Sequence, residues 1–133
     1  MAVLDGSLDG GTVSRRERSH GYWSGRAPEY SQLHRGELAS ERGARLRAFV
    51  ASLPSVRPGA RVLDLGCGSG ILSTILSGLG CRVTGVDFSE EMLEEARTNV
   101  AVCGVAELAG FEVMDAHALD FPDETFDLVI TRN

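Results

Sequence analysis

The sequence predicts an α/β fold in which a parallel sheet is doubly wound by helices. Short runs rich in Val, Leu and Ile alternate with stretches whose apolar residues recur at helical spacing. The links between them are short, and one is a glycine-rich turn, residues 66–70, that leads from an apolar strand into a helix. Such alternation is typical of parallel strands joined by right-handed crossovers.

The four expected strands cover residues 61–65, 82–86, 111–114 and 126–131. The apolar face of the helix after the first strand consists of Ile71, Leu72, Ile75, Leu76 and Leu79. The apolar face of the helix after the second strand consists of Leu93, Ala96, Val100 and Cys103. Ser89 stands at the N-cap position of this second helix, and Gly80 and Gly104 are placed to end the two helices.

The 133 residues suffice for one modest domain. We expect a flexible tail over residues 1–20, a helical cap over 21–57 and a sheet-forming half-domain over 58–133. The expected cap helix covers residues 37–53, and its apolar stripe consists of Leu46, Phe49, Val50 and Leu53. The segment 21–34 holds Tyr22, Trp23 and Tyr30 and is either a lid over a ligand or a helix on the core.

Charge and composition exclude several classes of function. The net charge is −6, and residues 58–133 carry four Arg against thirteen acidic residues, which argues against a nucleic-acid partner. There is no Lys, so a Walker-type phosphate loop is excluded. No apolar run approaches the ~18 residues of a membrane span, and the N-terminus lacks a signal pattern, so we expect a cytoplasmic protein.

The cysteines and histidines do not predict a metal site. Cys67, Cys81 and Cys103 include no CxxC pair, and we expect them to be small buried or half-buried thiols. The three histidines are scattered and lack the spacing of metal ligands.

The spacing of the glycine turn distinguishes between two classes of nucleotide cofactor. A dinucleotide fingerprint, G-x-G-x-x-G, would need glycine at position 71, which is Ile71. The turn instead has Gly66, Gly68 and Gly70, and Asp64 precedes it. A carboxylate there would repel a pyrophosphate but suits a ligand with an ammonium or sulfonium group. A nicotinamide-dependent dehydrogenase is therefore a distant alternative.

Four stretches together resemble the class I S-adenosylmethionine-dependent methyltransferases, especially the small-molecule branch called type 11 or UbiE-like. These stretches are residues 62–70 (VLDLGCGSG), 85–89 (GVDFS), 114–116 (MDA) and 126–133 (FDLVITRN). The match covers residues 58–133, and the segment from Tyr22 to Tyr30 resembles the family's N-terminal cap. The resemblance implies a Rossmann-like, three-layer α/β/α fold with S-adenosylmethionine as the cofactor.

The resemblance also implies roles for residues around the first two strands. The turn made by Gly66, Cys67, Gly68 and Gly70 would face the methionyl part of the cofactor, with Asp64 near its amino group. Asp87 matches the residue that accepts hydrogen bonds from both ribose hydroxyls, a good task for an ionised carboxylate. The alternatives are that Asp87 only ends a strand and that Cys67 is only a small loop residue.

The remaining implied contacts concern the adenine and the ammonium group. Phe88 and Met92 would lie against the adenine faces, although a helical Met is also a usual core residue. Asp115 and Ala116 match the positions that read the adenine edge, and Asp115 could instead be a turn residue. Asn133, with its neighbour Arg132, matches the position whose backbone often holds the methionyl ammonium.

The function predicted from the resemblance is methyl transfer from S-adenosylmethionine to a small molecule. No catalytic acid or base is named. The sequence stops at Asn133, after the fourth strand, whereas the family has seven strands in the order 3-2-1-4-5-7-6. We therefore expect the fourth strand to have an unpaired edge, where a second copy could form a homodimer. The alternative function is an inactive or self-associating fragment that binds the cofactor weakly without turnover.

Overall fold

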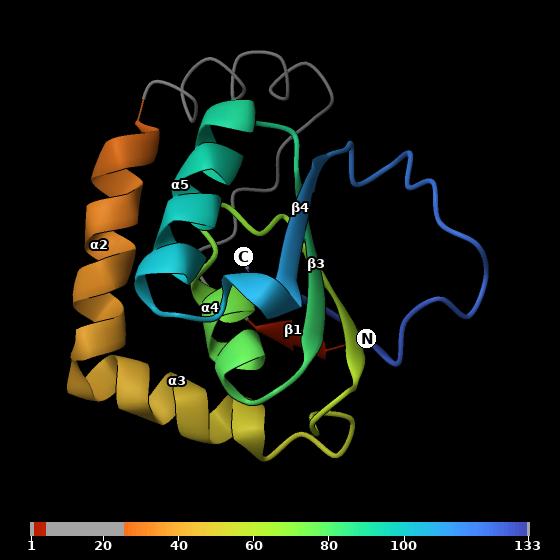
Figure 1. The fold of residues 1–133 in the computed structure, drawn as a ribbon, viewed down its shortest axis with the longest axis horizontal. Helices are drawn as coiled ribbons and strands as arrows, with labels where there is room; N and C mark the ends of the chain where they lie inside the picture. Colours follow the sequence, from red (N-terminus) through yellow and green to blue (C-terminus); the bar gives the residue numbers. More distant parts are fainter. Residues whose placement is uncertain (1, 5–25, 133) are drawn as a thin grey trace.

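A computed structural model of the chain describes residues 2–4 and 26–132. It contains a five-stranded sheet, with all neighbouring strands parallel, in the order β1-β5-β2-β3-β4 (Figure 1). The strands are β1 (Ala2–Leu4), β2 (Arg61–Leu65), β3 (Arg82–Asp87), β4 (Ala109–Val113) and β5 (Leu128–Arg132). The predicted parallel, Rossmann-like sheet is confirmed, and β2 to β5 are the four strands expected from the sequence.

The described helices lie together on one face of the sheet (Figure 1). They are α2 (Ala27–Ala39), α3 (Glu41–Ala51), α4 (Ile71–Gly78) and α5 (Glu90–Val102), and a short 3-10 helix covers Ala106–Leu108. Helices α4 and α5 pack directly on the strands, while α2 packs outside α5 and α3. The described helices thus all lie on one side of the sheet, and the long segment between β4 and β5 lies toward the other side.

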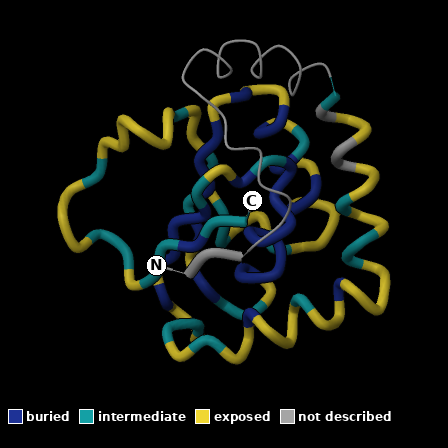
Figure 2. The backbone as a smooth tube through the Cα atoms, turned by 180° about the vertical axis from the view of Figure 1, so that it is seen from behind, coloured by how far each residue is buried: buried dark blue, intermediate teal, exposed yellow. Residues whose placement is uncertain are grey.

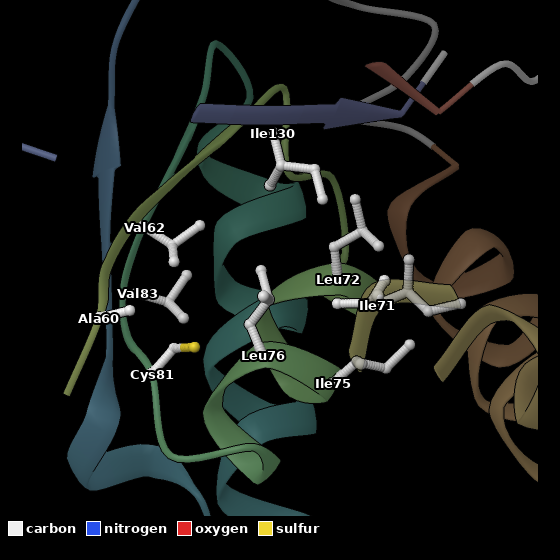
Figure 3. Packing of buried hydrophobic residues seen from close by; sticks show 10 residues of the cluster. Ala60, Val62, Ile71, Leu72, Ile75, Leu76, Cys81, Val83 and Ile130 are labelled. Atoms are coloured by element: carbon white, nitrogen blue, oxygen red, sulfur yellow. The ribbon is translucent and has the colours of Figure 1, made fainter. Parts of the chain in front are cut away.

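The main apolar core lies between α4 and the strands. Val62, Val83 and Ile130 project from three neighbouring strands toward Leu72 and Leu76 of α4 (Figure 3). The buried segments in Figure 2 follow this region, whereas α2 and α3 are largely exposed along their outer faces. This packing places the carboxyl ends of β2 and β3 beside the start of α4, where the glycine turn lies.

The prediction of one cap helix over residues 37–53 is wrong, because two helices meet within it at Ser40. The backbone of Ser40 is extended, with φ −92° and ψ 169°, and its hydroxyl accepts a hydrogen bond from the Gly43 N–H at 3.2 Å. Ser40 therefore begins α3 as an N-cap. The predicted apolar stripe is also only partly correct, because Val50 is buried while Phe49 is 49% exposed.

The prediction of an unpaired edge on the fourth expected strand is wrong. β1 runs parallel to β5 and pairs with it from Ala2↔Ile130 to Leu4↔Arg132. Residues 2–4 are therefore a strand rather than part of a flexible tail, and the remaining residues assigned to the tail lie outside the described chain, as do Tyr22 and Trp23. Cys103, expected on the apolar face of α5, is exposed because α5 ends at Val102.

Candidate functional site

The glycine turn connects the carboxyl end of β2 to the first turn of α4. Gly66, Gly68 and Gly70 have φ angles of 69°, 55° and 84°, a region that favours glycine. The Cys67 N–H donates to the Val86 carbonyl at 2.9 Å, and the Gly70 N–H donates to the Cys67 carbonyl at 2.9 Å. The first bond holds the turn against β3, and the second closes the turn itself.

The surface of the turn is open at its first glycine and tightly packed at its last. No atom lies within 4 Å of the position that a Cβ on Gly66 would take. A Cβ on Gly70 would lie 3.0 Å from the Ala96 Cβ of α5, so the absence of a side chain lets α4 approach α5 closely. A ligand can thus approach the backbone at Gly66, while Gly70 serves the packing of the helices.

Asp64 lies beneath the turn and is only 1% exposed. One carboxylate oxygen accepts a hydrogen bond from the Ser73 hydroxyl at 2.7 Å, and no ion pair involves Asp64 within the described residues. Burial raises the pKa of Asp64 to about 6, and the negative charge of Asp87 adds to this effect. A cation on the turn would offset the cost of this charge, as expected for a ligand with an ammonium or sulfonium group.

Asp87 ends β3 and organises the turn through both of its carboxylate oxygens. Oδ2 accepts a hydrogen bond from the Gly68 N–H at 2.9 Å, and Oδ1 accepts one from the Ser89 N–H at 3.0 Å. A carboxylate oxygen can accept more than one hydrogen bond. Asp87 is therefore more than the end of a strand, because it joins the glycine turn to the start of α5.

The structure places the other residues expected around β3 in different environments. Phe88 is 36% exposed directly after the strand, while Met92 is buried in the first part of α5. Cys67 is buried, and its Sγ lies 3.0 Å from the position of a Cβ on Gly85, so it shares the space above that glycine with the ring of Phe111. Burial raises the pKa of the Cys67 thiol well above its ordinary value, which keeps the thiol protonated.

Asp115 and Ala116 follow β4 and are brought next to Asp87. The Met114 N–H donates to the Asp87 carbonyl at 2.9 Å, which continues the alignment of β3 and β4 by one residue. Asp115 and Ala116 are exposed, and one Asp115 carboxylate oxygen accepts from the His117 N–H at 2.8 Å. The structure thus shows the turn-forming role of Asp115 and leaves its side chain accessible. Asn133 lies outside the described residues.

Residues of the cap that the sequence reasoning missed lie against the glycine turn. His34 of α2 shares a hydrogen bond with the Ser69 hydroxyl, and its Cε1 lies 4.0 Å from the position of a Cβ on Gly68. The Arg35 guanidinium donates to the Asn99 Oδ1 at 2.6 Å, and the Asn99 amide donates to the Ser69 carbonyl at 2.9 Å. No local sequence pattern predicts these contacts, because the two residues of each contact are far apart in the sequence.

A second link joins the cap to the carboxyl end of β5. The Arg132 guanidinium donates to both carboxylate oxygens of Glu37, at 2.5 and 3.2 Å. This pair lowers the pKa of Glu37, because the hydrogen bonds and the positive charge favour the carboxylate. The part of α2 that carries His34, Arg35 and Glu37 is thus fixed to the glycine turn, to α5 and to β5.

The site therefore combines an open glycine turn, two buried carboxylates beneath and beside it, and a polar helix face above it. No group of residues suited to hold a metal ion occurs within residues 2–4 and 26–132. A separate groove of about 370 Å³ lies at the opposite, amino ends of β2, β3 and β4, where Arg61, Arg82 and Gly110 line it. No helix in the same part of the chain is long and apolar enough to cross a membrane.

Comparisons with known proteins agree with this geometry. A family model described as a methyltransferase domain matches residues 62–133. The chain is 50% identical over 72 residues to a phosphatidylethanolamine N-methyltransferase of Cereibacter sphaeroides, which is 54% of this chain and 35% of that protein. It is 33% identical over 129 residues to a ubiquinone biosynthesis O-methyltransferase of Rhizobium johnstonii, which is 93% of this chain and 51% of that protein.

A solved structure shows the same fold. The chain resembles the crystal structure of a SAM-dependent methyltransferase from Thiobacillus denitrificans in complex with S-adenosyl-L-homocysteine, with a TM-score of 0.56 and 34% identity. The match covers 65% of this chain and 35% of that one. The chain thus spans about half or less of the length of each of these three proteins.

Proposed function

Because the chain belongs to the class I S-adenosylmethionine-dependent methyltransferase family, we propose that it binds S-adenosylmethionine on the glycine turn and transfers its methyl group to a small molecule. The observation that carries the proposal is the arrangement of Asp64 and Asp87 around the open turn at Gly66. One carboxylate lies beneath the place of a cation, and the other stands at the end of the adjacent strand.

The strand order supports a linear arrangement of the cofactor across the sheet. The order β5-β2-β3-β4 places the glycine turn, Asp87 and Asp115 at the ends of three successive strands. In the proposed arrangement the amino-acid part lies over the turn, the ribose at Asp87 and the adenine between Phe88 and Asp115. Met92, which is 4% exposed, is also proposed to lie against the adenine.

The residues present fit this cofactor. The open backbone at Gly66 accepts a close approach, and the charge of Asp64, which burial makes costly, favours a cationic group above it. When bound, S-adenosylmethionine supplies a methyl group on a positively charged sulfur. The chain's own residues would bind the cofactor and the acceptor and orient them. Alignment of the two reacting atoms supplies much of the acceleration of such a displacement. We assign no residue as a catalytic acid or base.

The test is calorimetric titration of the whole chain with S-adenosylhomocysteine, the demethylated product. We expect saturable binding with one site per chain. Absence of heat at high micromolar concentrations, from a chain shown to be folded by circular dichroism, would contradict the proposal. The adenosine part can be tested separately by titration with 5′-methylthioadenosine, which has the nucleoside and the thioether but no amino-acid group.

The alternative is a chain that binds the cofactor weakly without turnover, alone or after self-association. The chain spans 35% and 51% of the lengths of the two curated relatives, and the alternative concerns what this span does by itself. Size-exclusion chromatography, combined with an assay for S-adenosylhomocysteine production over a panel of small acceptors, distinguishes the two. Turnover supports the enzyme, whereas binding without turnover, by a monomer or by a dimer, supports the alternative.

A further inference from the structure

One helical turn of α2 carries polar side chains that face the glycine turn, residues 66–70. His34 reaches Ser69 and Gly68, and three residues further along α2 Glu37 reaches Arg132 at the end of β5. Side chains three positions apart lie on the same face of a helix. The face of α2 that carries His34 and Glu37 therefore lies over the β2–β5 end of the site, away from Asp115 at the β4 end.

The strand order places only one part of the cofactor at the β2–β5 end of the site. If the ribose lies at Asp87, at the end of β3, the adenine extends toward β4 and the amino-acid part extends toward β2 and β5. The amino-acid part carries an ammonium and a carboxylate. Asp64 beneath the turn suits the ammonium, so the carboxylate needs a donor from another direction.

We propose that His34 is a contact residue for the amino-acid part of the cofactor and donates a hydrogen bond from its imidazole to the carboxylate. This inference rests on the proposed function, because it takes the ligand from there. The ring already lies against the two turn residues, Gly68 and Ser69, over which that part of the ligand would extend.

The position of His34 is set by its neighbours on α2 rather than by its own contact alone. The bond from Arg35 to Asn99, together with the ion pair between Arg35 and Glu95 at 3.6 Å, fixes the helix to α5. The bidentate pair between Arg132 and Glu37 fixes it to β5. A donor held in place before the ligand arrives costs less ordering on binding.

The protonation state of His34 is compatible with this role. Burial lowers the pKa of His34, the charge of Glu37 opposes that effect, and the charge of Arg132 adds to it. At pH 7.5 the imidazole is therefore neutral, and when Nδ1 accepts from the Ser69 hydroxyl the single N–H lies on Nε2, from which it can be donated. Titrations at this pH measure the hydrogen bond without a change in the charge of His34.

The test compares two ligands on the same variants. S-adenosylhomocysteine has the amino-acid group, and 5′-methylthioadenosine lacks it, so only the first can contact His34 as proposed. For His34→Ala we expect the affinity for S-adenosylhomocysteine to fall at least about tenfold, the size of a lost hydrogen bond to a charged group, with unchanged affinity for 5′-methylthioadenosine. His34→Gln, which retains a donor at similar reach, should recover part of the loss.

The matched control is Gln32→Ala, a change at an exposed residue of the same helix. It should leave both affinities unchanged. The inference is overturned if His34→Ala weakens both ligands equally, which would indicate only a structural role in holding the turn, or if it weakens neither. Failure of the proposed function gives a different result, because then the unchanged chain itself does not bind S-adenosylhomocysteine.

Discussion

Asp64 and Asp87 lie beneath and beside the glycine turn, and burial makes the charge of Asp64 costly. Asp64 is 1% exposed and Asp87 is 8% exposed, and the charge of Asp87 raises the pKa of Asp64. A folded chain that places two carboxylates so close together gives up stability at neutral pH. Such a cost is expected at a binding site, where a cationic ligand offsets it.

The cost of burying the charge of Asp64 predicts that Asp64→Asn raises the stability of the chain in a pH-dependent way. The pKa of Asp64 is raised from 3.8 to about 6 in the folded chain, so folding favours the protonated form. This contribution to stability is complete below pH 3.8 and is lost as the pH rises through 6, which leaves a cost of about 3 kcal/mol above that pH. Asn keeps an oxygen that can accept the bond from Ser73.

Urea unfolding at several pH values measures this effect. The unfolding free energy of Asp64→Asn should exceed that of the unchanged chain by about 3 kcal/mol at pH 7.5. The difference should approach zero below pH 4. The same variant should bind S-adenosylhomocysteine less tightly. A difference that does not depend on pH would show that the charge of Asp64 is not the source of the cost.

Asp87→Ala tests the proposed ribose contact. Loss of an ionised acceptor of hydrogen bonds costs about 1.5–3 kcal/mol, so the affinity for S-adenosylhomocysteine should fall roughly ten- to hundredfold by calorimetry. Stability should also fall, because the Gly68 and Ser89 N–H groups lose their acceptor. Glu94→Ala, at an exposed position of α5, is the control. Unchanged affinity in the Asp87 variant would show that the ribose role is misassigned.

At the scale of elements, the glycine turn couples α4 to α5 as well as to a ligand. Gly70 starts α4 in a left-handed conformation, and the Ala96 Cβ of α5 lies where a side chain on Gly70 would point. The start of α5 is in turn fixed by Ser89, whose hydroxyl accepts from the Met92 N–H at 3.2 Å. A change at the turn should therefore affect the packing of both helices.

A comparison of Gly70→Ala with Gly59→Ala distinguishes the cost of a clash with α5 from the cost of backbone strain. Both glycines have φ 84°, but a Cβ on Gly59 meets nothing within 4 Å, whereas one on Gly70 lies 3.0 Å from the Ala96 Cβ. Gly59→Ala should cost about 1–2 kcal/mol for the left-handed backbone alone. Gly70→Ala should cost clearly more in urea unfolding and should weaken ligand binding. Equal costs would show that Ala96 does not restrict position 70.

The boundaries of elements show where a local pattern is insufficient. The strands and the helices α4 and α5 could be predicted, because the apolar alternation, Ser89 and the turn glycines are strong local signals. The break between α2 and α3 could not, because Ser40 fits a helix interior or an N-cap equally well until its neighbours are packed. The strand at residues 2–4 depends on pairing with β5, more than a hundred positions away.

At the scale of the whole molecule, the site could be predicted on its sheet side and not on its cap side. Asp64 lies within β2, Gly66 and Gly68 follow that strand directly, and Asp87 ends β3, so each belongs to a short local motif that can be recognised in the sequence. The contact of His34 with Ser69 joins residues 35 positions apart, and that of Glu37 with Arg132 joins residues 95 positions apart. Such contacts arise only when the cap helix packs on the sheet, so no periodicity in the sequence indicates them.

The central claim is that the cofactor binds on the glycine turn at the carboxyl ends of the strands. An NMR titration of the ¹⁵N-labelled chain with S-adenosylhomocysteine tests it residue by residue. We predict that the amide signals of Gly66, Gly68 and Ser89 shift in a saturable manner, while those of Arg82 and Gly110, at the opposite groove, remain in place. Shifts confined to the opposite groove, or no shift in a folded chain, would contradict the claim.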